Sequence, residues 1–338
     1  MEVTKVNVLV TGGAGFIGSH LAEHHLKKGD DVTVIDNLAR TEYNIKYLQE
    51  TYPQVRFRRG DVADPRTFEG LTGDLDVVYH CAAQVAVTTS LTNPRLDYDT
   101  NANGTFNLCE ALRASGSDPA IVFCSTNKVY GDLLLPVVAT KTRYKYKNIR
   151  GIDESYPLET NCPYGGSKIV AEFILDTYRE SFGLRVAKAR MSCIYGTRQF
   201  GNEDQGWVAW FTIAAVTGRP ITIYGDGKQV RDILYISDQN AAFEALARKI
   251  KKTNGRAYNL GGGTDYTTSL FELLDDIEDI TGRRSPMTFG DWRMGDQKVY
   301  ISDTRKIKRE LGWKPKVSPR KGVEKIAEWT MEHRELFA

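Results

Sequence analysis

A tyrosine and a lysine four residues apart, Tyr164 and Lys168, are the side chains of this chain best suited to acid–base chemistry. Residues i and i+4 of a helix lie on one face, so the lysine ammonium can lie near the tyrosine phenol. A free phenol has a pKa of about 10, and a nearby cation lowers that pKa because it stabilises the phenolate. The pair could therefore act as a general base toward a substrate hydroxyl.

A third polar side chain is expected beside this pair. Thr126 follows Ser125 at the end of an apolar run, residues 121–125, which we predict to be a strand. The end of that strand should lie beside the start of the helix that carries Tyr164, where Thr126 could hydrogen-bond and orient the reacting oxygen. The candidate catalytic residues are thus Thr126, Tyr164 and Lys168, with an ordinary hydroxyl at a strand end as the alternative for Thr126.

Residues 7–36 have the pattern of a dinucleotide-binding unit. A short apolar strand leads into Gly12, Gly13, Gly15 and Gly18, a helical pattern follows, and a second strand ends at Asp36. The glycines allow a tight turn and a close approach to a pyrophosphate, and the helix start offers N–H groups to the phosphates. An acid at position 36 can bond a ribose diol and would repel a 2′-phosphate, which favours NAD over NADP.

The elements that must position these residues alternate between strand and helix. Several of the strands are continuous apolar runs, as expected of parallel strands buried on both faces. The pattern predicts a Rossmann-type, doubly wound parallel sheet with a smaller C-terminal α/β lobe that binds substrate. The predicted strands cover residues 6–10, 32–36, 55–60, 77–82, 121–125 and 185–189, and the predicted helices include 19–28, 103–115 and 167–182.

We assign residues 1–190, with about 233–263, to the dinucleotide-binding domain, and residues 191–232 and 264–338 to the second lobe. An insertion at 131–155 has no steady helical or strand period. A loop of that length in a compact domain is usually a lid or disordered, and its position favours a lid over the active site.

The composition excludes several classes of protein. The formal net charge is +2 over 338 residues, so we expect neither a nucleic acid nor a membrane surface as partner. There is no long apolar run and no secretory signal, and the five cysteines are scattered without a CxxC pair, which favours a cytoplasmic protein. No histidine lies at metal-ligand spacing from a cysteine or acid, so we expect no metal.

Together these motifs resemble the extended short-chain dehydrogenase/reductase family, and the resemblance covers nearly the whole chain. The family uses NAD(P) to modify nucleotide sugars. By match to its motifs, Asp61 and Val62 flank adenine, Asn101 holds the central strand and cofactor region together, and Lys168 also contacts the nicotinamide ribose. The full set of expected cofactor-binding residues is Gly12, Gly15, Phe16, Ile17, Gly18, Asp36, Asn37, Asp61, Val62, Ala82, Ala83, Gln84, Asn101, Ser125, Tyr164 and Lys168.

Longer segments resemble, within that family, the epimerases that act at C2 of CDP-linked hexoses of the paratose and tyvelose type. They cover residues 84–94, 142–144, 195–200, 204–211, 229–232 and 296–303. Independently of the resemblance, arginines can pair with a diphosphate and aromatic rings can pack on a base or sugar. The expected substrate-binding residues are Gln84, Thr126, Asn127, Arg198, Gln199, Phe200, Gln205, Tyr224, Arg231, Arg293 and Asp296.

The expected reaction inverts C2 of a CDP-sugar through a transient 2-keto sugar, with Tyr164 as base and a tightly bound NAD regenerated in each turnover. A UDP-hexose 4-epimerase, a nucleotide-sugar reductase and a non-catalytic NAD-sensing protein are the alternatives. A 4,6-dehydratase is disfavoured, because Asn127 and Lys128 stand where dehydratases carry an acid pair, whereas Cys193 in place of the usual family asparagine fits the narrower group. The resemblance also implies a homodimer or homotetramer that pairs through helices 103–115 and 167–182.

Overall fold

The computed structural model describes residues 5–293 and 295–337. The chain divides into two compact units. Unit 1 comprises Met1–Val129, Cys162–Arg190 and Asn240–Tyr258, and unit 2 comprises Tyr130–Asn161, Met191–Gln239 and Asn259–Ala338. The predicted domain boundaries, which kept 131–161 and 233–263 with the dinucleotide-binding domain, stay a prediction.

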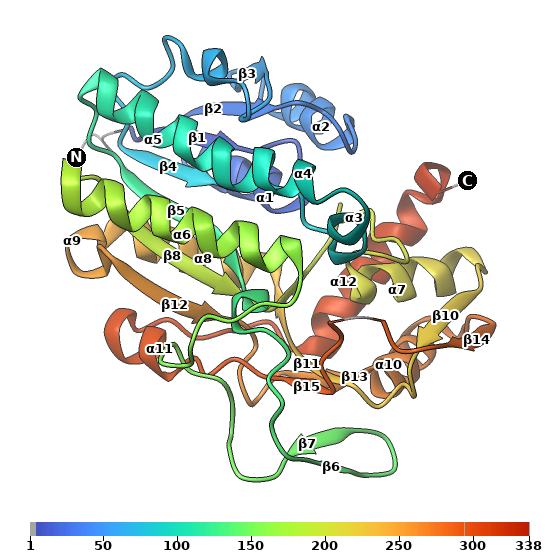
Figure 1. Cartoon of the computed structure of the whole chain (residues 1–338). Helices are drawn as coiled ribbons and strands as arrows, with labels where there is room; N and C mark the ends of the chain where they lie inside the picture. The colour runs from blue at the N-terminus through green and yellow to red at the C-terminus, as the bar shows by residue number, and fades with distance from the viewer. Residues whose placement is uncertain (1–4, 294, 338) are drawn as a thin grey trace. The chain divides into compact units, whose positions relative to one another are not determined.

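Unit 1 is built on a seven-stranded sheet in the order β12-β8-β5-β4-β1-β2-β3 (Figure 1). Neighbouring strands from β3 to β5 pair in parallel. All seven residues of β5 are buried, which explains its unbroken run of apolar and small side chains. The predicted fold class is confirmed. The strands are β1 (Asn7–Thr11), β2 (Asp31–Asp36), β3 (Arg56–Arg59), β4 (Val77–His80), β5 (Ala120–Thr126), β8 (Arg185–Met191) and β12 (Arg256–Leu260).

Helices cover this sheet, and two of them matter most for the site. α6 (Pro163–Phe182) begins with proline at its first position and ends at Gly183, whose φ of 80° caps the helix. It packs against α5 (Gly104–Ser115), beside which it runs in Figure 1. The remaining helices are α1 (Phe16–Leu26), α2 (Tyr43–Thr51), α3 (Val87–Thr92), α4 (Pro94–Asp97), a π-helical segment (Tyr98–Asn103), α8 (Ile236–Arg248) and α9 (Ile250–Thr253).

Besides a two-stranded hairpin described below, unit 2 has two small sheets packed with helices. One runs β13-β11-β15 with β9 also paired to β11, and the other pairs β10 with β14. Its strands are β9 (Cys193–Tyr195), β10 (Ile221–Tyr224), β11 (Val230–Tyr235), β13 (Thr267–Ser269), β14 (Met287–Gly290) and β15 (Val299–Tyr300), and its helices are α7 (Trp207–Thr217), α10 (Leu270–Thr281), α11 (Arg305–Leu311) and α12 (Pro319–Glu332).

The insertion at 131–155 contains an antiparallel hairpin of β6 (Val137–Ala139) and β7 (Tyr144–Tyr146), although its sequence showed no strand period. Contacts within unit 2 hold the hairpin. The Tyr144 hydroxyl donates to Asp226 at 2.6 Å, and the Arg143 guanidinium pairs with Glu272. A role as a lid stays a prediction. In the part of the chain that the structure describes, no helix has the length and apolar character needed to cross a membrane.

Candidate active site

The end of β5 and the start of α6 bring Thr126 and Tyr164 together. Their side-chain hydroxyls are hydrogen-bonded to each other, and the two residues are only 7% and 8% exposed. Thr126 Oγ1 also accepts the backbone N–H of Lys128 at 3.2 Å, which fixes its rotamer. The sequence predicted that these two residues lie together. The arrangement places the Tyr164 phenol beside a hydroxyl that can orient the reacting oxygen of a substrate.

Lys168 lies one turn further along α6 and is 2% exposed. Its Nζ donates to the Cys124 carbonyl at 2.9 Å and lies 4.7 Å from the centre of the Phe123 ring. Burial lowers the pKa of Lys168 to about 8, against the favourable fields of Cys124 and Cys81. The ammonium is thus held by the strand end that also carries Thr126.

The acidity of Tyr164 differs from the sequence-based expectation of a lowered pKa. Burial raises the pKa of Tyr164 to about 12, and the hydrogen bond from Thr126 only partly offsets this. Desolvation disfavours the phenolate more than the chain's own groups stabilise it. The expected lowering of the Tyr164 pKa relied in part on the positive charge of the nicotinamide ring, which the cofactor brings and the chain does not.

The glycine loop has the shape of a phosphate cradle. A Cβ on Gly18 would lie 2.3 Å from the Gly12 carbonyl oxygen, and one on Gly12 would lie 2.6 Å from the Ala82 nitrogen. Gly15 is the N-cap of α1 and offers no capping side chain, so no side chain blocks the first-turn N–H groups, among which are those of Phe16 and Ile17. This open helix start fits a dinucleotide pyrophosphate.

The carboxylate at the end of β2 faces the same loop. Asp36 accepts the N–H of Ala14 at 3.0 Å and that of Leu38 at 2.8 Å, so both oxygens help to shape the turn. Burial raises the pKa of Asp36. Asn37 donates to Asp61 at 3.0 Å, which joins the ends of β2 and β3 where the adenosine half is expected.

The segment after β4 is held to the catalytic helix by Asn101. Its amide exchanges hydrogen bonds with the backbone of Gln84, at 2.9 and 3.1 Å, and donates to Ser167 at 2.9 Å. Asn101 therefore fixes the loop that begins with Ala82 and Ala83. Val62 is buried against Gly104, where a Cβ would lie 2.6 Å from its side chain.

One buried ion pair near the site was missed at the sequence level. Arg190 lies 2.7 Å from Glu172, and Ser125 donates to the same carboxylate at 2.5 Å. Ser125, predicted to contact the cofactor, is thus engaged with α6. The missed signal was helical spacing, because Tyr164, Lys168 and Glu172 follow one another at intervals of four residues.

Unit 2 carries the charged part of the predicted substrate set. The Arg293 guanidinium lies 3.7 Å from the centre of the Tyr224 ring, and the Tyr224 hydroxyl donates to Glu203 at 2.7 Å. Arg231 lies 3.7 Å from Asp296. Arg231 and Arg293 therefore already have an acidic or aromatic neighbour that orients them.

The loop after β9 holds the rest of the set. Arg198 and Phe200 both have positive φ, 58° and 36°, which is a strained conformation for such large residues. The Phe200 ring packs against Trp329 and Phe337, so its described contacts are with the protein core. Gln199 donates to the Ile194 carbonyl at 3.1 Å.

Three further positions complete the placement of the predicted residues. Gln205 exchanges backbone hydrogen bonds with Asn202 in the same loop. The Asn127 Oδ1 lies 3.4 Å from the Thr126 hydroxyl. Cys193 accepts the indole N–H of Trp207 at 3.4 Å, so this thiol, the departure from the family asparagine, has a donor from α7.

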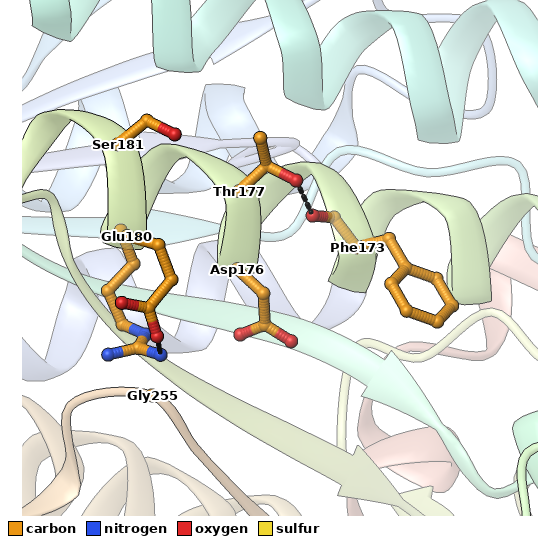
Figure 2. A pocket seen from close by; sticks show the side chains of 7 residues that line it. Phe173, Asp176, Thr177, Glu180, Ser181 and Gly255 are labelled. Carbon is orange, nitrogen blue, oxygen red and sulfur yellow. Dashed lines mark hydrogen bonds and ion pairs between the residues drawn. The ribbon is translucent and has the colours of Figure 1, made fainter.

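A pocket of about 440 Å³ lies elsewhere, between α6 and Gly255 (Figure 2). Phe173, Asp176 and Thr177 are among its lining residues, and Asp176 also pairs with Lys188 at 2.6 Å. Asp176 follows Tyr164 by twelve residues, about 18 Å along a helix. This pocket is therefore separate from the catalytic group.

Residues 9–326 match the model of the GDP-mannose 4,6-dehydratase family. The chain belongs to this family. The expected relation to the extended short-chain dehydrogenases/reductases is thereby confirmed.

Individual members of the family resemble this chain over almost their full length. CDP-paratose 2-epimerase of Salmonella typhi is 39% identical over 336 residues, covering 96% of this chain and 99% of that protein. The UDP-glucose 4-epimerase of Thermotoga maritima, solved with UDP-glucose, is 29% identical with a TM-score of 0.84, covering 98% of this chain and 100% of that one. The UDP-glucose 4-epimerase of Thermus thermophilus, solved with NAD, is 32% identical with a TM-score of 0.81, covering 96% and 98%.

Proposed function

We propose that this chain is an NAD-dependent epimerase that inverts C2 of a CDP-linked hexose of the paratose or tyvelose type, with Tyr164 as the base. Its broader kind, an NAD-dependent nucleotide-sugar epimerase, follows from its relatives. The observation that carries the proposal is the buried hydrogen bond between Thr126 and Tyr164 on a dinucleotide-binding unit. The choice of C2 and of CDP rests on the similarity to the Salmonella enzyme.

The chain's own residues fit the cofactor. The loop of Gly12, Gly15 and Gly18 would hold the pyrophosphate, and Asp36 would hold the adenosine ribose. When bound, NAD supplies the acceptor and donor of hydride. Lys168 would contact the nicotinamide ribose and keep a positive charge near Tyr164.

Tyr164 would take the proton from the C2 hydroxyl while that carbon becomes a carbonyl, and it would return the proton after the sugar has presented its other face. Thr126 would hold the same oxygen. A base of this kind contributes roughly 10²- to 10⁴-fold in rate. Arg198, Arg231 and Arg293 would bind the diphosphate, about which the sugar turns.

A 4,6-dehydratase function is disfavoured despite the family's name. Elimination of water needs an acid and a base beyond Tyr164, and the residues after Thr126 are Asn127 and Lys128. The second candidate is a UDP-hexose 4-epimerase, which the similarity to the two solved structures favours. It would use the same Thr126, Tyr164 and Lys168.

The test is an NMR time course of the purified protein with CDP-paratose in deuterated water, without added NAD. Conversion to the C2 epimer with hydrogen retained at C2 is the expected result. Deuterium at C2 would mean proton abstraction from carbon and would overturn the mechanism. Turnover of UDP-galactose without turnover of CDP-paratose would favour the 4-epimerase.

We also propose that the chain pairs with itself through α5 and α6. Both helices expose large apolar side chains on unit 1, namely Phe106, Val170, Phe173 and Phe182. Exposed apolar side chains on neighbouring helices are a common feature of interfaces between subunits. Light scattering should give a dimer or tetramer, and Phe173→Glu, at a side chain 62% exposed, should shift it toward monomer. A monomeric wild-type protein would contradict this.

A further inference from the structure

Asp97, the last residue of α4, is a fully buried carboxylate that the proposed mechanism does not use. Both of its oxygens accept the side-chain amide of Gln84, at 3.0 and 2.9 Å. A buried charge costs free energy unless an opposite charge or hydrogen bonds compensate it. Its neighbour Asp99, by contrast, is bound to Arg95 at the surface.

The Gln84 amide is fixed in one orientation. Its Nε2 also donates to the Ala86 carbonyl at 2.9 Å, and its Oε1 accepts the Ala86 N–H at 2.6 Å. The amide hydrogens are therefore in use, while Oε1 keeps one lone pair. With its backbone bound by Asn101, Gln84 can offer a ligand an acceptor and no donor.

The charge of Asp97 also acts on the catalytic pair. It raises the pKa of both Tyr164 and Lys168, and Lys168 in turn lowers the pKa of Asp97, which burial raises. Glu172 is compensated by Arg190. The titratable groups that face the pair from the packed elements are Cys81, Asp97, Cys124, Cys162 and Glu172, together with His80.

We propose that Asp97 is a positioning residue of the active site, which locks Gln84 as a hydrogen-bond acceptor for a substrate hydroxyl and whose charge balances that of Lys168 beside Tyr164. The proposal rests on the proposed function, since Gln84 is taken to face the sugar and Tyr164 to be the base. On this proposal Asp97 does not itself touch the substrate, but it determines that Gln84 accepts a hydrogen bond from it.

The decisive variant is Asp97→Asn, which keeps the shape and removes the charge. The new amide can accept from the Gln84 Nε2 through one oxygen only and brings its own NH2 group beside that donor, so the Gln84 amide is held less firmly. We expect kcat/KM to fall roughly 10- to 100-fold, as misplacement of one positioning group does. The acid limb of its pH profile should move down by roughly one unit, because the Tyr164 phenolate loses a like-charged neighbour.

Two further proteins separate this role from a structural one. In Gln84→Glu/Asp97→Asn, the asparagine can donate to the new carboxylate, so the acceptor and the charge are both restored. We expect this double variant to recover part of the activity and to return the acid limb of the pH profile part of the way to its wild-type position. Asp99→Asn, two residues away and at the surface, should match wild type in both measurements.

Activity is measured with CDP-paratose and with UDP-galactose. The ionisation of Tyr164 is followed separately by phenolate absorbance in the NAD-containing protein, and the absorbance of the Tyr164→Phe variant is subtracted. Failure with CDP-paratose alone would refute the proposed substrate, while Asp97 is still judged on the other sugar and on the absorbance. The positioning role would be overturned if Asp97→Asn left both the acid limb of the pH profile and the phenolate titration of Tyr164 unshifted, whether or not activity is lost.

Discussion

Glu172 and Arg190 form an ion pair at 2.7 Å in which both side chains are almost fully buried, 3% and 8% exposed. The pair joins α6 to β8, and Ser125 donates a further hydrogen bond to the Glu172 carboxylate from the end of β5. It therefore ties the helix that carries Tyr164 to the strand that carries Thr126.

Breaking that pair should cost stability. Glu172→Gln leaves Arg190 charged and buried without its counter-ion, for which losses of about 3–5 kcal/mol are typical. Urea unfolding would measure the loss. Ser125→Ala, which removes only the hydrogen bond from Ser125, should cost less, about 1.5–3 kcal/mol. Equal losses in the two variants would contradict the assignment of the ion pair as the main contributor.

Tyr164→Phe should reduce turnover by roughly 10²- to 10⁴-fold, because it removes the group that transfers the proton. Cofactor content and thermal stability of this variant should stay close to wild type. Thr126→Val, which keeps the shape of the side chain, should lower kcat with a smaller effect. Substantial activity in Tyr164→Phe would show that another residue is the base.

Activity should decline as the pH rises past about 8, the pKa of Lys168, because the ammonium beside Tyr164 is then lost. The measurement is the pH dependence of kcat/KM. Lys168→Arg keeps the charge at all accessible pH values and should remove this alkaline limb. A limb unchanged in that variant would belong to a different group.

The glycine loop predicts a sharp effect of a single methyl group. In Gly18→Ala the new Cβ would lie 2.3 Å from the Gly12 carbonyl oxygen, so the loop must move and the purified protein should lose its NAD. Gly73→Ala is the matched control, since a Cβ there meets no atom within 4 Å. Equal cofactor content in both variants would argue against the cradle.

Acid should destabilise the protein through His80, which lies between the hydroxyls of Thr11 at 2.7 Å and Thr105 at 3.0 Å. Burial lowers its pKa to about 3. Above about pH 6.5 the ring is neutral in both states, and below it only the unfolded chain takes up the proton. The free energy of unfolding then falls by about 1.4 kcal/mol per pH unit down to the folded pKa.

The measurement is urea unfolding at about pH 6.5 and pH 5, where His80 alone accounts for a loss of about 2 kcal/mol. His80→Gln can still exchange hydrogen bonds with both threonines and does not titrate. Its stability should fall less over the same interval. An identical decline in the variant would place the acid sensitivity in other groups.

The sequence alone was enough for the fold class and the dinucleotide unit, because both depend on local patterns. Glycine spacing, an acid at the end of β2 and unbroken apolar strands follow directly from the shape of a parallel sheet. The pairing of Tyr164 with Lys168 follows in the same way from helical periodicity. The ends of α10, residues 270–281, also carry local signals, since a capping box and Gly282 mark them.

Tertiary structure decided what depends on distant residues and on burial. Gln84 and Asp97 lie 13 positions apart in the chain, with the starts of α3 and α4 between them, and no local period joins them. The hairpin at 137–146 is held by contacts with Asp226 and Glu272, which its own sequence does not contain. The pKa of Tyr164 rose where the neighbouring cation had suggested a fall, because desolvation is a property of the packed interior and is not encoded in the spacing of two residues.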